Sequence, residues 1–171
     1  MRMGQFLAGL TVFCALAAGF GVWYTNVYAF YDTVEPTGED VQLTTLAGTP
    51  EVIPVEGFEG IDADSSPIRY RACFTTTLSL PELTATYAPY EGAEPRVAPA
   101  WFDCFDAEAL GTEIAAGRAQ VFTGVRNIEW GIDRVVAITG QGRGYVWHEI
   151  NDCGAKAYDG TPLGEDCPPR D

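Results

Sequence analysis

The residues best suited to chemistry lie in the stretch GQGRGYVWHEIND, residues 140–152, which holds the only histidine of the chain, His148. A histidine acts as a general base only when a nucleophile and an orienting acid lie within hydrogen-bond reach. None of the serines stands in the Gly-x-Ser-x-Gly motif that would supply such a nucleophile. On a strand, His148 shares a face with Val146 and Ile150, so we expect a partly buried structural residue.

The glycines before it, Gly140, Gly142 and Gly144, resemble a phosphate-binding loop in spacing only. Such a loop needs a helix N-terminus after it, whereas a strand pattern follows here, so we predict a hairpin turn. A phosphate-accepting histidine of a sensor kinase is excluded as well. It would require an ATP-binding domain, for which 171 residues leave no room.

Arg69 and Arg71 fall on one face of a predicted strand and form the clearest candidate for binding an anion. In an acidic chain we expect internal ion pairs instead. The candidate partners are the aspartates Asp62, Asp64, Asp103 and Asp106.

The segment DADSS, residues 62–66, spaces oxygen ligands like the start of a calcium loop. An EF-hand is excluded, because Pro67 takes the place of the required glycine and Cys73 that of the required glutamate. An irregular Ca²⁺ site remains as an alternative to the turn that we favour. We predict no catalytic residue, no cofactor and no metal.

Setting aside Cys14 in the apolar N-terminal segment, an even number of cysteines remains: Cys73, Cys104, Cys153 and Cys167. Three pairings are possible. We favour Cys73 with Cys104 and Cys153 with Cys167, because these close loops of moderate size. The support for a zinc site is weak, because the sequence has no C-x-x-C pair.

The elements that position these residues indicate a single α+β domain, an antiparallel sheet with two short helices on one side. Residues 32–67 are rich in proline and glycine and leave room only for short strands. A half-buried strand covers residues 66–77. The capping-box spacing of Ser79 and Glu82 predicts the first helix, and Asp106 begins the second, which Gly117 ends. Strands follow over residues 119–125, 129–138 and 144–150, and then a tail held by the second disulfide.

Residues 4–31 contain no charge and are long enough to cross a membrane as a helix. Arg2 precedes them and the acids Asp32 and Glu35 follow. This predicts a bacterial inner-membrane protein crossing once, with residues 1–31 as cytoplasmic stub and anchor and residues 32–171 as a periplasmic domain. The alternative is a signal peptide cleaved near Ala15-Leu16-Ala17.

The chain has 24 acidic and 10 basic residues, and every acid lies at or beyond Asp32. This surface excludes nucleic acid as a partner and excludes electrostatic attachment to anionic lipid. Membrane association must therefore come from the apolar segment.

We expect the domain to act by binding, as an accessory or assembly partner of a membrane or envelope complex. Aromatic and arginine side chains dominate interface energetics. The interaction surface predicted on this basis consists of Arg69, Arg71, Trp101, Trp130, Tyr145 and Trp147. The alternative is a small-ligand or metal-ion sensor, or a hydrolase that uses carboxylates such as Asp103, Asp106 and Glu108.

A resemblance to a protein family extends over almost the whole chain. It rests on the N-terminal span and on the motifs DADSSPIRYRACF, APAWFDCFDAEA, NIEWGIDRVVAI, GRGYVWHEINDCG and EDCPP. The chain resembles an uncharacterised family of small alphaproteobacterial proteins with one membrane anchor and a domain of unknown function. The resemblance implies localisation and architecture, and it brings no catalytic residues.

Overall fold

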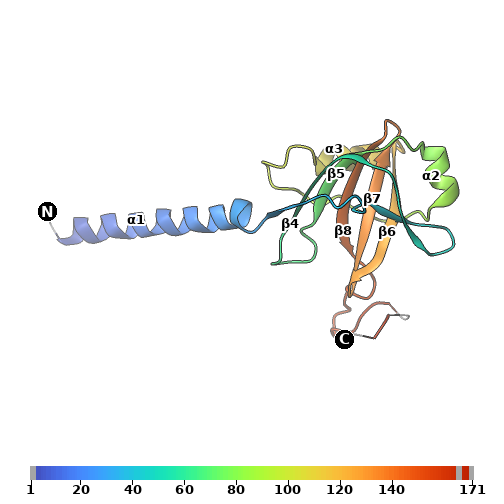
Figure 1. The fold of residues 1–171 in the computed structure, drawn as a ribbon. Coiled ribbons are helices and arrows are strands. Elements are labelled where there is room, and N and C mark those ends of the chain that lie inside the picture. The colour runs from blue at the N-terminus through green and yellow to red at the C-terminus, as the bar shows by residue number, and fades with distance from the viewer. Residues whose placement is uncertain (1–2, 165–166, 170–171) are drawn as a thin grey trace.

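A long apolar helix leads into a curved antiparallel sheet with short helices around it (Figure 1). The structure, a computed structural model, describes residues 3–164 and 167–169. The elements follow in the order α1 (Met3–Tyr24), η1 (Thr25–Ala29), β1 (Asp32–Val34), β2 (Gln42–Thr44), β3 (Pro50–Val52), β4 (Glu56–Asp62), β5 (Arg71–Thr75), α2 (Leu80–Thr86), α3 (Ala107–Ala115), β6 (Ala119–Glu129), β7 (Ile132–Thr139) and β8 (Arg143–Ile150). The predicted α+β class is confirmed.

The main sheet has six strands in the order β1-β4-β5-β8-β7-β6, and every neighbouring pair is antiparallel. A separate hairpin of β2 and β3 forms a second, two-stranded sheet. Strand β8 lies near the middle of the main sheet and is buried from Gly144 to Glu149. The β7–β8 turn is the predicted hairpin, in which Gly142 adopts a φ of 77°.

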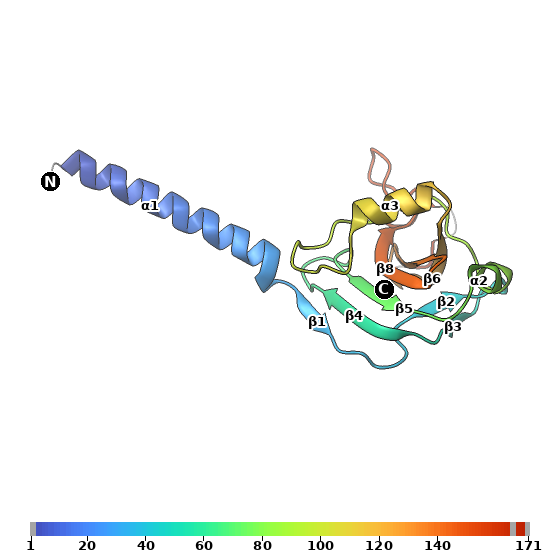
Figure 2. The same ribbon diagram turned by 90° about the horizontal axis from the view of Figure 1, so that it is seen from above.

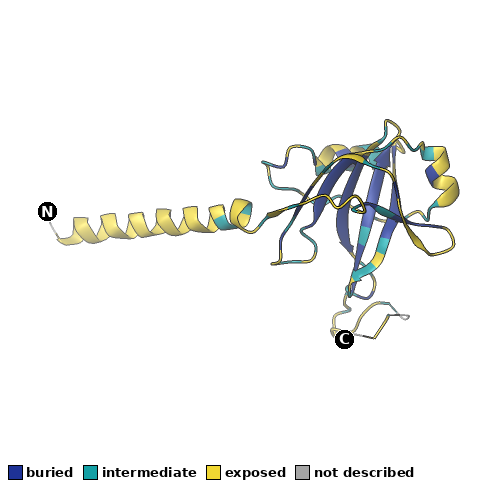
Figure 3. Cartoon of the chain, in the orientation of Figure 1, coloured by how far each residue is buried: buried dark blue, intermediate teal, exposed yellow. Residues whose placement is uncertain are grey.

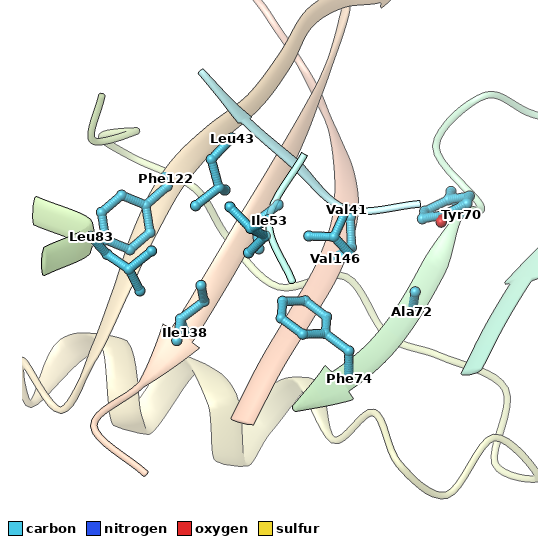
Figure 4. Packing of buried hydrophobic residues seen from close by; sticks show 11 residues of the cluster. Val41, Leu43, Ile53, Tyr70, Ala72, Phe74, Leu83, Phe122, Ile138 and Val146 are labelled. Carbon is cyan, nitrogen blue, oxygen red and sulfur yellow. The ribbon is translucent and has the colours of Figure 1, made fainter. Parts of the chain in front are cut away.

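One face of the sheet is covered by the β2–β3 hairpin and α2 (Figure 2). Figure 4 shows this core, in which Val146 of β8 packs among side chains from both covering elements. Its fully buried members include Leu43, Ile53, Leu83 and Ile138. Helix α2 contributes Leu83, so it belongs to this face.

The opposite face is covered by α3 and the segment that precedes it (Figure 2). Trp147 of β8 packs here with Phe105 and with Leu110 of α3. The two helices therefore lie on opposite faces of the sheet, and the prediction that both lie on one side is wrong. Successive residues of β7 and β8 point to opposite faces, and both faces are apolar, so each face needs its own cover.

Both predicted helix starts are confirmed. The backbone N–H of Ser79 donates to the Glu82 carboxylate at 2.9 Å, as in a capping box. The Asp106 carboxylate accepts from the Ala109 N–H at 3.0 Å. Helix α3 ends just before Gly117, whose φ is 68°.

The short strands predicted before residue 67 are found as β2 and β3, but the seven-residue strand β4 was not predicted. Its residues EGFEGID include two glycines, which disfavour a strand locally. Pairing with β5 on one side and β1 on the other supplies the backbone hydrogen bonds that local preference does not. A register shift between Glu56 and Glu59 accommodates the irregularity.

The favoured disulfide pairing is confirmed. Cys73 of β5 bonds to Cys104 ahead of α3, with Cα atoms 6.2 Å apart. Cys153, just after β8, bonds to Cys167, with Cα atoms 5.5 Å apart.

The segment Met3–Ala29 forms a helix that is long enough and apolar enough to cross a membrane. Signal sequences share this property. Its side chains from Met3 to Tyr24 are exposed along its whole length (Figure 3). A helix with this composition that buries nothing within its own chain needs an apolar environment around it.

Candidate binding site

A cavity of about 750 Å³ opens where β8 ends, between the segment at residues 89–92 and the C-terminal disulfide segment. Polar and charged side chains make up much of its lining: Tyr90, Glu91, Arg126, Asn127, Glu149, Asn151 and Asp152. Its volume suits a small molecule or a few side chains of a partner.

Two asparagines build the floor of this cavity. Register shifts between Thr123 and Glu129 bend the end of β6, and Asn127 adopts a left-handed φ of 47° there. The Asn127 side-chain oxygen accepts from the Gly131 N–H at 3.1 Å and from Asn151 Nδ2 at 2.9 Å. The Asn151 side-chain oxygen in turn accepts from the Cys153 N–H at 3.0 Å. The β6–β7 turn and the disulfide segment are thus joined.

Asp133 of β7 lies directly behind this floor and is 0% exposed. Its Oδ1 accepts from the Asn127 N–H at 2.9 Å and from Asn151 Nδ2 at 2.7 Å. Its Oδ2 is buried and has no hydrogen bond of good geometry among the described residues; Arg126 Nη1 stands 3.5 Å away in an ion pair, and the Tyr90 hydroxyl interacts with the carboxylate. A buried carboxylate oxygen in this state retains capacity for a further donor.

Arg126 and Tyr90 stand over this carboxylate. The Arg126 side chain is 67% exposed, and its guanidinium lies 5.9 Å from the centre of the Tyr90 ring. Burial, followed by the negative charges of Asp133 and Glu149 and by a side-chain hydrogen bond with Asp133, raises the pKa of Tyr90 to about 12. Tyr90 is therefore a neutral hydroxyl that can donate or accept a hydrogen bond.

Glu149 forms the adjoining wall and is fixed by three donors. Its carboxylate accepts from Trp147 Nε1 at 2.8 Å, from the Glu94 N–H at 2.8 Å and from Arg96 Nη2 at 2.7 Å. These bonds tie β8 to the segment before α3 and make the wall rigid.

The chemistry of the cavity is acidic. Glu91, Glu149 and Asp152 line it and Asp133 lies behind it. Arg126 pairs with Asp133 and Arg96 pairs with Glu149, which leaves Glu91 and Asp152 as the excess acids. Such a site favours a cationic group. The described residues contain no cluster of three or more histidine, cysteine or carboxylate side chains suited to a metal ion.

His148 lies on the other face of β8 and is 4% exposed. Arg134 Nε donates to its Nε2 at 3.0 Å, so its Nδ1 carries the proton and donates to the carbonyl of Pro67. Burial, and after it the positive charges of Arg134 and Arg71, lowers its pKa to about 4. Because both ring nitrogens are engaged, His148 acts as a structural residue in this conformation.

The predicted interaction surface is corrected by the structure, which does not bring its six residues to one face. Trp147 is 0% exposed and Tyr145 is 9% exposed, because α3 and the segment before it cover that face of β8. The remaining aromatics are half-buried: Trp101 donates to the carbonyl of Val27 at 2.6 Å, and Trp130 to that of Pro168 at 3.0 Å.

The expected pairing of Arg71 with aspartates is also wrong. Arg71 is 5% exposed, and within the described part of the chain it donates to backbone carbonyls, those of Ile68, Tyr70, Arg96 and Val97. Arg69 is half-buried, with its guanidinium 5.7 Å from the centre of the Tyr31 ring. Loop carbonyls satisfy Arg71 because the two segments beside β5 fold over its side chain.

The carboxylates considered for hydrolysis do not line the 750 Å³ cavity. Asp106 caps α3, while Asp103 and Glu108 are exposed beside it. The segment at residues 62–66 forms the favoured turn, in which the Ser66 N–H donates to the Ala63 carbonyl at 3.2 Å.

Sequence reasoning missed the residues of the cavity, Asp133 above all. One signal was available: Asp133 stands in the apolar run GIDRVVAI, and a charged residue on a buried strand requires partners. The asparagines that supply those partners come from a turn and from the end of β8, and their sequence positions give no indication of this.

The fold and the cavity together define a small, disulfide-bonded α+β domain with an acidic pocket, preceded by an apolar helix. The chain belongs to a family of unknown function, DUF6446, whose model matches residues 41–168. No curated protein and no solved structure matches the chain.

Proposed function

We propose that this chain is a membrane-anchored binding protein of the bacterial inner membrane, with its N-terminus in the cytoplasm and the domain at residues 32–171 in the periplasm. The apolar helix Met3–Ala29 and the two disulfides support this arrangement. The orientation follows from the positive-inside tendency, with Arg2, which lies outside the described residues, ahead of the helix.

The domain acts by receiving a basic group of a partner protein in the pocket at the end of β8, as an accessory or assembly factor of a membrane or envelope complex. One observation carries this proposal: directly behind an acidic cavity, the buried Asp133 carboxylate has one oxygen that is held only by the exposed Arg126 side chain, 3.5 Å away, beside the neutral Tyr90 hydroxyl. An incoming ammonium or guanidinium would displace the exposed Arg126 side chain and pair with that oxygen.

Photo-crosslinking in living cells tests the proposal. A photoreactive amino acid replaces Glu91 at the rim of the pocket, or Gln120 at the far end of β6, where the side chain is also exposed. We expect a discrete crosslinked protein from position 91 and none from position 120. Equal labelling at the two positions, or no product at position 91, would contradict the proposal.

A small-ligand sensor is the second candidate, and the cavity volume of about 750 Å³ favours it. A thermal-shift screen of the full-length protein with amines, divalent cations and anions separates the two. A ligand that binds only the folded state raises the Tm, whereas a partner protein leaves the response to small molecules flat.

A further inference from the structure

The end of the apolar helix is fastened to the domain. Trp101 Nε1 donates to the carbonyl of Val27 at 2.6 Å, and the ring of Trp101 stacks on Tyr28 with centroids 6.1 Å apart. Trp101 also makes an edge contact with Tyr31, again at 6.1 Å. Its segment is bonded to β5 through Cys104. A defined face of the domain therefore lies next to any membrane that the helix crosses.

Two segments form this face. The connection between β4 and β5 and the segment before α3 both lie on the side of the domain at which the helix enters (Figures 1 and 2). Arg71 joins them, because its guanidinium donates to the carbonyls of Ile68 and Tyr70 in the first and of Arg96 and Val97 in the second. Val97 itself is 82% exposed. The two segments are thus joined, and the second presents an exposed apolar side chain.

Arg69 lies in the first of these segments, and part of its guanidinium group lacks a hydrogen-bond acceptor among the described residues. Its Nη1 is buried with no hydrogen-bond partner among the described residues, and its guanidinium stands 5.7 Å from the centre of the Tyr31 ring. An N–H of arginine left in this state costs free energy unless an acceptor binds it, and an external acceptor reaches it only when the half-buried side chain turns outward. Tyr28, Phe30 and Tyr31 are aromatic residues of the kind that gather at headgroup level.

We infer that Arg69 binds the phosphate of a phospholipid in the leaflet facing the domain, and that the two segments joined by Arg71 rest on the membrane surface. Guanidinium and phosphate form strong, directional hydrogen bonds, and phosphate is the acceptor that this depth of a bilayer offers. The net acidity of the chain favours a zwitterionic lipid such as phosphatidylethanolamine over an anionic one. This inference rests on the anchor part of the proposed function and does not depend on the pocket.

Native mass spectrometry of the full-length protein in detergent tests the inference. The protein is titrated with phosphatidylethanolamine and with the diacylglycerol that has the same acyl chains and no phosphate. Arg69→Gln removes the guanidinium, and Arg143→Gln makes the same charge change at the other end of the β5–β8 ladder. Arg69→Lys keeps the charge and loses the planar fork, and a cooperative thermal unfolding transition in every variant shows that the domain is folded.

We expect wild type and Arg143→Gln to retain the phospholipid about tenfold more tightly than the diacylglycerol, Arg69→Gln to lose this preference, and Arg69→Lys to fall between. An Arg69→Gln variant that keeps the full preference would overturn the inference. So would inorganic phosphate that removes the preference at low millimolar concentration, because the site would then be one for a free anion. Neither outcome affects the crosslinking expected from position 91, so the lipid proposal and the pocket proposal can fail independently of each other.

Discussion

Arg134 Nε lies 3.0 Å from His148 Nε2 and donates a hydrogen bond to it. The same guanidinium stands 4.1 Å from the centre of the Tyr70 ring, and Tyr70 stacks on His148 with ring centroids 4.9 Å apart. A permanently charged arginine thus faces one side of a histidine whose other nitrogen donates to the carbonyl of Pro67. This arrangement holds only while His148 is neutral.

The stability of the domain should fall at acidic pH because of His148. The pKa of His148 is lowered to about 4 in the folded protein and returns to its ordinary value near 6.5 on unfolding. Its contribution to stability is complete above about pH 6.5 and is lost as the pH falls from there to 4, by roughly 3 kcal/mol in total. Urea unfolding of the full-length protein at a series of pH values measures this loss.

His148→Gln is the matched control, because an amide can accept from Arg134 and donate to Pro67 without titrating. We expect its stability curve to be flatter than that of wild type between pH 6.5 and 4. Parallel curves for the two proteins would show that another group controls acid unfolding.

The second prediction concerns two glycines. A Cβ on Gly144 would lie 2.0 Å from the ring of Phe74, so Gly144→Ala should destabilise the domain by about 1–3 kcal/mol or more. A Cβ on Gly111 in α3 meets nothing within 4 Å, so Gly111→Ala should stabilise the helix by about 0.5–1 kcal/mol. Thermal unfolding of both variants checks the opposite signs, and a Gly144→Ala variant as stable as wild type would show that the strand can move aside.

The third prediction concerns the disulfides. Cys73 and Cys104 are 31 residues apart, and Cys153 and Cys167 are 14 apart. In the loop-entropy model, replacing the first pair by alanines costs about 4 kcal/mol and replacing the second about 3 kcal/mol. Urea unfolding of the two double variants measures the costs.

The first disulfide also anchors the segment that carries Trp101. Its loss should therefore increase proteolysis between the end of α2 and α3 as well, while loss of the second pair should expose only the C-terminal segment. Identical cleavage patterns in the two variants would argue against this assignment.

The fourth prediction concerns Glu149. Glu149→Gln keeps the shape of the side chain but places an N–H where Arg96 now donates, so it should lower the free energy of unfolding by about 1–3 kcal/mol. Glu91→Gln, at the exposed rim of the same pocket, should leave stability within about 0.5 kcal/mol of wild type. Equal effects of the two changes in denaturant unfolding would mean that the buried carboxylate network adds nothing.

Much of the fold was predictable where the signal is local. The cap residues Ser79 and Asp106, the Gly117 stop and the β7–β8 turn all act within a few residues, and each of these predictions is confirmed. Strand β4 was not predictable, because its glycine-rich sequence forms a strand only when β5 pairs with it. Pairing between strands that are distant in sequence overrides local propensity.

The candidate site was harder to predict from the sequence than the fold. Aromatic and arginine residues were expected on a surface, yet Trp147 and Arg71 are buried, because residue type predicts interface composition and not the face that a strand presents. The pocket depends on Asp133, Asn127 and Asn151, which meet only after β6, β7 and β8 have paired. The spacing of these residues in the sequence therefore gives no sign that their side chains come together.

The claim that the domain binds its partner through Asp133 is tested most directly by quantitative affinity purification of the full-length protein from membranes in a mild detergent. Asp133→Asn removes the buried negative charge at almost constant shape, and Asp103→Asn makes the same change at an exposed site beside α3. We predict that wild type and Asp103→Asn recover the protein that crosslinks at position 91 in equal amounts, and that Asp133→Asn recovers at least about tenfold less, as expected for loss of a charged hydrogen bond. Equal recovery with a correctly folded Asp133→Asn variant would contradict the account.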